Sequence, residues 1–109
     1  MIDVDTLPAC PVETTLTLIS DKWKILIVRD LLTGTKRFSE LRRSIGHISQ
    51  KVLTSNLRQM EADGLVHREV YPEVPPRVEY SLTDTGHSLK TVIAALWNWG
   101  EDYKAKLAA

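Results

Sequence analysis

The sequence predicts a mainly helical α+β fold, in which a helix-turn-helix is followed by a two-stranded hairpin and a long last helix. Three observations predict it. Two segments with helical apolar periodicity, 38–45 and 49–63, are joined by a short turn that contains Gly46. Residues 65–83 then change to the alternating pattern of β-strands around a proline-rich tip. The segment 84–107 returns to helical periodicity, and this order of elements is that of a winged helix.

The composition fits one small globular domain. The chain has 109 residues, of which 43% are hydrophobic, so we interpret residues 1–109 as a single domain with residues 1–9 as an N-terminal arm. No apolar run approaches the ~20 residues that a membrane helix needs, and the N-terminus lacks the regions of a signal peptide. A single cysteine excludes an internal disulfide and fits a reducing compartment. We therefore expect a cytoplasmic protein.

The charges are polarised along the chain, although the formal net charge is zero. Between Lys36 and Arg58 there are six basic residues and one acid, Glu40, which gives a net charge of +5 in 23 residues. The rest of the chain has eight basic and thirteen acidic residues, a net charge of −5. The positive pole of such a molecule attracts polyanions such as nucleic acid, and the alternative is an ordinary solvated run of charge.

Start signals and apolar periodicity predict the first helices. Pro11 suits the first turn of a helix and opens PVETTLTLIS. The segment KWKILIVRDLLTG is apolar on most faces and ends at Gly34, which predicts a buried central helix. TKRF is a short extended piece. SELRRSI is a compact helix whose inward side, together with the residue before it, consists of Phe38, Leu41 and Ile45.

The next helix has well-marked ends. Ser49 is a good N-cap, and Gly64 suits the left-handed residue after the helix. Ile48 and Leu53 have the spacing of a hydrophobic staple. The inward stripe is narrow and consists of Leu53, Leu57 and Met60. The opposite face is polar or basic without any acid, and its members are Gln50, Lys51, Thr54, Ser55 and Arg58.

Residues 65–83 predict a β-wing. LVHREVY and RVEYSL are rich in β-branched and aromatic residues, as strands are. PEVPP between them makes a stiff, non-helical tip. This interpretation places Arg77 at the base of the wing.

Residues 84–107 predict a terminal helix that is capped by Thr83 or Asp84. Its apolar stripe is wider than the core of one small domain needs. The stripe consists of Leu89, Val92, Ile93, Leu96, Trp97, Trp99 and Tyr103. We therefore predict that this helix packs against a second copy of the chain in a homodimer.

Several stretches together resemble one family. They are CPVETTLTLISDKWKILIVRDLL, RFSELRRSIGHISQKVLTSNLRQMEADGLVHR and YPEVPPRVEYSLTDTGHSL. From Cys10 to Trp99 the chain resembles the HxlR family of bacterial transcription regulators, which are relatives of the MarR superfamily. The resemblance implies a homodimeric DNA-binding repressor or activator, with the helix from Ser49 in the major groove. Ser20-Asp21 replaces the glycine-rich junction of many relatives and touches none of the positions expected to face DNA.

The polar face of the helix from Ser49 is accordingly interpreted as a DNA-reading surface. Long polar and basic side chains can bond base edges and phosphates, for which an acidic or apolar face is unsuited. The expected partner is double-stranded DNA with an inverted-repeat operator. The predicted contacts are Ser49, Gln50, Lys51, Thr54, Ser55 and Arg58, with Arg37 and Arg77 on phosphates at the flanks. Arg68 is expected either to pair with Glu79 across the hairpin or to contact DNA.

Cys10 is a redox candidate. It precedes Pro11 at a helix start, where amide groups and the helix dipole favour a thiolate, although Glu13 opposes further activation. The resemblance implies an oxidant or electrophile sensor, since several such regulators are thought to sense through a cysteine at this place. The alternative is a small residue that packs at the dimer interface.

Other classes of protein have little support in the sequence. His47, His67 and His87 have no metal-ligand spacing, so no metal or other cofactor is expected. No G-x-S-x-G motif, phosphate loop or carboxylate pair is present, and we predict that the chain is not an enzyme. The alternative function is a winged helix used as a protein-interaction module, which predicts an acidic or apolar outer face on the helix from Ser49.

Overall fold

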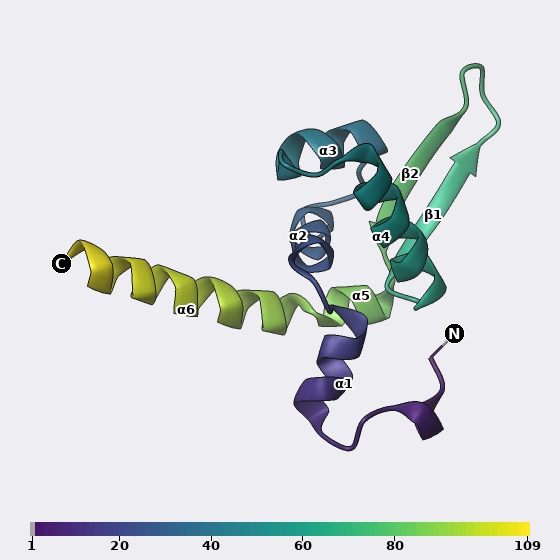
Figure 1. The fold of residues 1–109 in the computed structure, drawn as a ribbon. Coiled ribbons are helices and arrows are strands. Elements are labelled where there is room, and N and C mark those ends of the chain that lie inside the picture. The colour runs from purple at the N-terminus through teal and green to yellow at the C-terminus, as the bar shows by residue number, and fades with distance from the viewer. Residues whose placement is uncertain (1) are drawn as a thin grey trace.

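The computed structural model describes residues 2–109 and is a mainly helical winged helix, as the sequence predicts. The elements in chain order are η1 (Val4–Thr6), α1 (Pro11–Leu18), α2 (Lys22–Leu31), α3 (Phe38–Ile45), α4 (Gln50–Ala62), β1 (Val66–Tyr71), β2 (Arg77–Leu82), α5 (Asp84–Ser88) and α6 (Lys90–Ala108). Figure 1 shows the β1–β2 hairpin and α6 projecting from the body of the molecule in different directions. The helix-turn-helix consists of α3 and α4.

The core lies around α2, which packs against α3, α4, β2 and α6. Side chains from the helices and from the base of the hairpin fill it, among them Ile27, Val28, Leu31, Leu41, Leu53, Leu57, Met60, Leu65 and Leu82. α2 is therefore the central helix that its apolar composition predicts. The inward stripe of α4 is also confirmed, because its three predicted members are at most 2% exposed.

α2 buries two charged side chains, although the sequence predicts a helix that is apolar on most faces. Lys24 is 1% exposed, and its Nζ donates to Oγ of Ser20 at 3.4 Å. Asp30 is 8% exposed, and its Oδ1 accepts from Nε of Arg29 at 2.9 Å. Its Oδ2 atom is buried and has no hydrogen-bond partner within residues 2–109.

Cap geometry confirms the predicted ends of α4 and the cap before α5, whereas α2 ends at Leu31 and not at the predicted Gly34. Oγ of Ser49 accepts a hydrogen bond from the backbone N–H of Val52 at 3.1 Å, so Ser49 is the N-cap of α4. Gly64 after α4 has φ +79°, a left-handed conformation that glycine adopts without strain. Oγ1 of Thr83 accepts from the N–H of Gly86 at 3.1 Å, so Thr83 caps α5.

The hairpin is antiparallel, and its geometry corrects two expectations about its arginines. Val66 pairs with Leu82 at the base and Tyr71 pairs with Arg77 at the outer end. Arg77 therefore lies next to the tip, and its placement at the base of the wing was wrong. The extended TKRF segment forms an isolated β-bridge with β2, because Lys36 and Tyr80 exchange backbone hydrogen bonds of 2.9 and 2.8 Å.

The expected pair between Arg68 and Glu79 does not form. Arg68 lies opposite Tyr80, and Glu79 lies opposite Glu69. Since alternate residues of a strand point to opposite faces, Arg68 and Glu79 are on different faces of the hairpin. The carboxylate of Glu79 instead bonds to Nη1 of Arg77 at 3.0 Å.

The terminal helix is divided at Leu89 into the short α5 and the long α6. Leu89 is buried in the protomer core, and its N–H donates to the carbonyl of Gly86 at 3.1 Å. Gly86 itself packs against the backbone of Leu65, so that a Cβ at this position would clash with the Leu65 carbonyl oxygen. This close approach fixes α5 against the start of the wing.

α1 and the outer part of α6 have little to pack against. Neither helix contains a buried residue. Val12 and Leu16 on α1 are 66% and 52% exposed, although their spacing of four residues makes one apolar stripe. In Figure 1, α6 extends well beyond the other helices. Among the described residues, no helix is both long and apolar enough to cross a membrane.

Candidate DNA interface

The predicted polar face of α4 is a continuous surface in the structure. Five of its side chains line one open groove, and they are Gln50, Lys51, Thr54, Ser55 and Arg58. All of them lie within two and a half turns of one helix, on the side away from the core. The structure therefore brings together every helix residue that was predicted to read DNA, with Ser49 at the N-cap just before them.

The core side of α4 holds this face in place. Leu53, Leu57 and Met60 anchor the helix to the core over two turns. Asn56 is also buried, and its Nδ2 donates to the carbonyl oxygen of Val52 at 2.9 Å. The groove-lining side chains thus project from a backbone that is fixed both by packing and by its N-cap.

Two further hollows continue the groove at either side. One lies toward α3 and shares Gln50 with the groove; its other lining residues are Phe38, Ser39, Arg42, Arg43 and Gly46. The other lies toward β1 and shares Thr54 and Arg58; its other lining residues are Leu57, Glu61, Arg68 and Tyr80. The result is a track from α3 across α4 to the wing, whose charged side chains are basic except for Glu61.

Three arginines of this track were either not predicted as contacts or left between two roles in the sequence. Arg42 and Arg43 on α3 were counted in the basic segment but were not predicted as contacts, because their side of α3 depends on how α3 packs. Arg68 was predicted either to pair with Glu79 or to contact DNA. The signal that could have found Arg42 and Arg43 is the excess of positive charge around the helix-turn-helix. Arg68 lies outside that segment, and its place beside α4 depends on how the hairpin packs.

The two predicted flanking arginines have different surroundings. Arg37 is exposed at the N-cap of α3, where its backbone N–H donates to Oε1 of Glu40 at 2.9 Å. Arg77 is already paired: its Nη2 is 3.2 Å from Oε1 of Glu73 and its Nη1 is 3.0 Å from Oε2 of Glu79. Its guanidinium carbon also lies 4.0 Å from the ring centroid of Tyr71.

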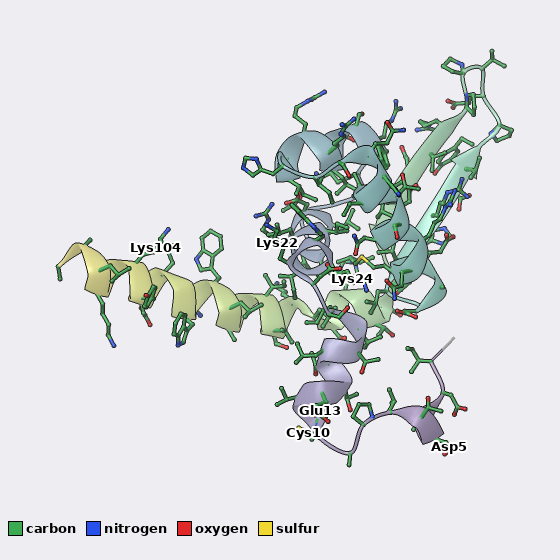
Figure 2. The ribbon with its side chains drawn as sticks, in the orientation of Figure 1. Asp5, Cys10, Glu13, Lys22, Lys24 and Lys104 are labelled. Carbon is green, nitrogen blue, oxygen red and sulfur yellow. The ribbon has the colours of Figure 1, made fainter. Side chains whose placement is uncertain are left out.

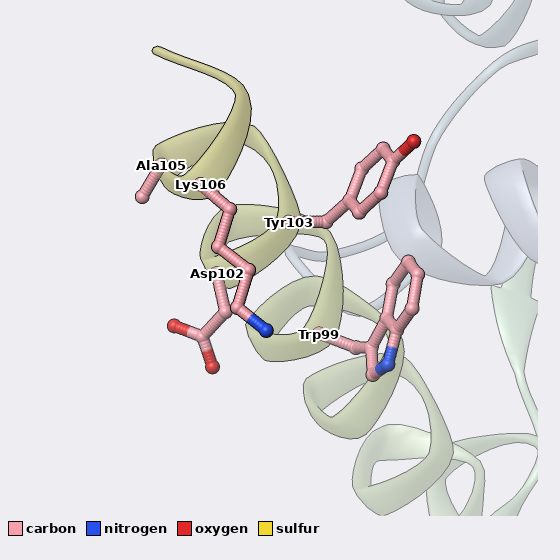
Figure 3. A pocket seen from close by; sticks show the side chains of 5 residues that line it. All are labelled: Trp99, Asp102, Tyr103, Ala105 and Lys106. Atoms are coloured by element: carbon pink, nitrogen blue, oxygen red, sulfur yellow. The ribbon is translucent and has the colours of Figure 1, made fainter. Parts of the chain in front are cut away.

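The predicted dimerisation stripe divides into a core part and an exposed part. Leu89 belongs to the protomer core, which leaves it little surface for a partner, and Val92 and Ile93 are partly buried against the same core. Leu96, Trp97, Trp99 and Tyr103 are 49–69% exposed. Figure 3 shows Trp99 and Tyr103 on one side of α6, where their rings stack at 5.2 Å between centroids.

Cys10 is the N-cap residue of α1 and is exposed. Its carbonyl oxygen accepts from the backbone N–H of Thr14 at 3.0 Å. Figure 2 shows Cys10 and Glu13 together at the start of α1, whereas the lysines labelled there lie on other elements. The thiol is therefore accessible, and the charge close to it in the protomer is negative.

The residues that the structure describes form no metal centre beside this interface. Within residues 2–109, no three side chains of histidine, cysteine, aspartate or glutamate come together in a way that would hold an ion.

A winged helix with a polar and basic face on the second helix of its helix-turn-helix defines the class of DNA-binding transcriptional regulators. The model of one family in this class, described as HxlR-like helix-turn-helix, matches residues 18–108. The chain belongs to this family. It is a transcriptional regulator of the helix-turn-helix type and not an enzyme.

Similar proteins agree with this assignment. The uncharacterized HTH-type transcriptional regulator YdeP of Bacillus subtilis (strain 168) is 50% identical over 103 residues, which cover 94% of this chain and 80% of YdeP. The redox regulator HypR in its reduced form matches with a TM-score of 0.84 and 47% identity, over 91% of this chain and 98% of HypR. Diamide-treated YodB from B. subtilis matches with a TM-score of 0.71 and 37% identity, over 86% of this chain and 94% of YodB.

Proposed function

We propose that the chain acts as a homodimer that binds an inverted-repeat operator in double-stranded DNA and reads it with α4 in the major groove. One observation carries the proposal: the polar side chains of α4 meet in a single open groove that basic hollows continue on both sides. The major groove of B-DNA is about 12 Å wide and admits an α-helix. An acidic or apolar face, which a protein-interaction module would favour, is not present on this side of α4.

The groove offers distinct roles to its side chains. Arg58 and Lys51 can donate hydrogen bonds to guanine or to phosphate, and the amide of Gln50 can form two hydrogen bonds with one adenine. Thr54 and Ser55 can bond either base edges or backbone. Oγ of Ser49 accepts the cap bond, so its hydroxyl proton remains to be donated to a phosphate.

The flanks would supply phosphate contacts, which position the protein without reading sequence. Arg37 is exposed at the start of α3 and remains a candidate from the sequence. Arg42 and Arg43 join it, because they line the hollow between α3 and the start of α4. In the DNA duplex, phosphates flank the groove on both sides, so a basic track on both sides of α4 fits this arrangement.

Band-shift titrations with substituted proteins test whether α4 reads the operator. Arg58→Ala and Lys51→Ala should each weaken binding to the operator by roughly 1–3 kcal/mol if the native side chain bonds a base. Lys90→Ala is the charge-matched control, since Lys90 is exposed at the start of α6 and far along the chain from the groove. Operator affinity of Arg58→Ala and Lys51→Ala equal to that of Lys90→Ala would contradict the assignment of the α4 face.

The dimer is proposed from the two helices that lack cover in the protomer. Aromatic and aliphatic side chains of α6 are exposed, and so are Val12 and Leu16 of α1, which leaves both helices with uncovered apolar area on a chain of only 109 residues. A second copy is the occupant we propose for it. Two-fold symmetry then places the two α4 helices one DNA turn apart, roughly 34 Å, or at a multiple of it.

We further propose that Cys10 makes operator binding responsive to oxidants or electrophiles. Its exposure at the N-cap of α1 supports this, as does the similarity to HypR, which is described as a redox regulator in oxidized and reduced forms. The chain has a single cysteine, so oxidation to a disulfide has to join Cys10 to the Cys10 of a second copy or to a small thiol. In that step two thiols lose two electrons and two protons, which diamide accepts.

A diamide titration tests this role. Operator affinity of the wild type should fall with diamide and recover with a thiol reductant. Cys10→Ser should bind the operator equally well with and without diamide. An equal response of both proteins would assign Cys10 to packing.

A further inference from the structure

We propose that Arg77 is a positioning residue of the wing and that Arg68, on the other face of the same hairpin, is the wing's phosphate contact. The inference rests on the proposed function, because it takes the wing to lie against DNA. It replaces the phosphate contact that the sequence predicts for Arg77, and it selects DNA contact from the two roles that the sequence leaves open for Arg68. Three features of the hairpin support it: its register, the partners of Arg77 and the position of Arg68.

The register places the two arginines on opposite faces. Arg68 is opposite Tyr80, and Arg77 is opposite Tyr71. Since side chains alternate along each strand, Arg68 and Tyr80 share one face, while Tyr71 and Arg77 share the other face. The face of Arg77 also holds the cross-strand pair of Glu69 and Glu79.

The charge of Arg77 is neutralised inside the hairpin. Its two Nη atoms bond to Glu73 at 3.2 Å and to Glu79 at 3.0 Å, and the guanidinium covers the ring of Tyr71. Two carboxylates against one guanidinium leave this cluster with a net negative charge. A DNA phosphate brought to Arg77 would have to displace a carboxylate and would be repelled by the other.

The bonds of Arg77 indicate that it orders the tip of the wing. Glu73 belongs to the tip loop, whereas Glu79 and Tyr71 belong to the two strands. One planar guanidinium with several fixed donors therefore ties the loop to both strands, which a lysine cannot do. The tip then reaches DNA already ordered, and the entropy of ordering it is not lost on binding.

The surroundings of Arg68 differ from those of Arg77. It is exposed, and it lines the hollow that lies between α4 and the wing, together with Arg58 and Tyr80. This hollow continues the groove on α4, with which it shares Thr54 and Arg58. A phosphate beside the major groove would thus meet two arginines here, with Glu61 as the single acid of the lining.

The first test needs no DNA. Hydrogen exchange of residues 70–78 is measured in the free wild type, Arg77→Ala, Arg77→Lys, Glu79→Gln and Arg68→Ala. The contacts of Arg77 with Glu73, Glu79 and Tyr71 form the clamp of the wing tip. The first three variants weaken or remove this clamp, so amide exchange at the tip should be faster in them, and Arg68→Ala should exchange like the wild type. Unchanged exchange in Arg77→Ala would overturn the positioning role, whatever the protein binds.

The second test is the salt dependence of operator affinity. Arg68→Ala should flatten the slope of log K against log salt by about 0.9 for each phosphate that is no longer neutralised, or about 1.8 for a dimer. Arg77→Ala should keep the wild-type slope while its affinity falls roughly 3- to 10-fold at every salt concentration, because a loop has to be ordered on binding. Arg77→Lys should resemble Arg77→Ala, since the charge remains but the clamp is removed.

Three results of these measurements would overturn the inference. A slope that flattens in Arg77→Ala but not in Arg68→Ala, or full rescue by Arg77→Lys, would assign the phosphate contact to Arg77 and overturn the inference. Glu79→Gln that binds more tightly would do the same, because it would mean that the carboxylate withholds Arg77 from DNA. A wild type that binds no operator would refute the proposed function, and hydrogen exchange would still decide the clamp.

Discussion

Replacing Trp99 by alanine should dissociate the proposed dimer. Trp99 is 69% exposed on α6 and stacks on Tyr103 within the protomer. A tryptophan side chain offers roughly 250 Å² to burial, so about 170 Å² remains for a partner to cover. We expect the partner to cover about half of that area, because the rim of an interface stays hydrated.

The cost of the substitution follows from this area. At about 25 cal/mol per Å², the loss is about 2 kcal/mol for each protomer and about 4 kcal/mol for the dimer. This corresponds to a rise in the dimer Kd of roughly a thousandfold. The substitution leaves the protomer fold intact, since no residue of α6 is buried.

Sedimentation equilibrium from nanomolar to tens of micromolar protein measures the effect. Glu101→Ala is the matched control, because a step of two residues from Trp99 is roughly 200° around the helix and Glu101 therefore faces the other way. We expect the wild type and Glu101→Ala to be dimers at micromolar concentration and Trp99→Ala to be mainly monomeric. A wild-type monomer, or a Trp99→Ala dimer as tight as the wild type, would refute the assignment of this surface.

Three substitutions test the protomer fold by thermal or urea unfolding. Gly86→Ala should lower the free energy of unfolding by about 1–3 kcal/mol, because the new Cβ clashes with the Leu65 carbonyl; an unchanged midpoint would contradict that packing. Ser49→Ala should cost about 1 kcal/mol through loss of the α4 cap, and Ser49→Asp should restore most of it. Lys24→Met should raise the free energy of unfolding by roughly 1 kcal/mol, since it removes a buried ammonium and keeps the side-chain volume; a less stable variant would mean that Lys24 has stronger partners than Ser20.

The recognition helix could be predicted from the sequence because its signals are local. An N-cap at Ser49, a glycine at its end and apolar residues at helical spacing act within one element, and each has one physical meaning. The face that is left outside follows from the same periodicity. The five side chains of the groove were therefore predicted without any knowledge of how α4 packs.

The wing could be predicted as a hairpin but not in its register. Five residues separate the paired ends Tyr71 and Arg77, and a proline-rich loop of that length does not fix which residues face each other. A slip of one residue moves every side chain to the other face. The wrong partner for Arg68 comes from this uncertainty. The position of Arg77 does not depend on the register, because Arg77 directly follows the PEVPP tip in the sequence and could have been placed next to the tip.

The terminal helix shows another limit of reasoning from periodicity. A wide apolar stripe does not say which part of it packs inside the protomer and which part is left for a partner. The division at Leu89, where α5 turns into α6, depends on the contact of Gly86 with Leu65 far away in the sequence. Buried Lys24 was missed for a similar reason, since its burial depends on the elements around α2.

Selection of genomic fragments by the purified protein tests the central claim most directly. Fragments bound by the wild type, by Arg58→Ala and by Lys90→Ala are sequenced at the same salt concentration. Our account predicts that the wild type and Lys90→Ala enrich a shared inverted repeat, with half-sites one helical turn or a multiple of it apart, and that Arg58→Ala loses this enrichment. Enrichment without any shared sequence, or the same repeat selected equally by Arg58→Ala, would contradict the claim that α4 reads DNA.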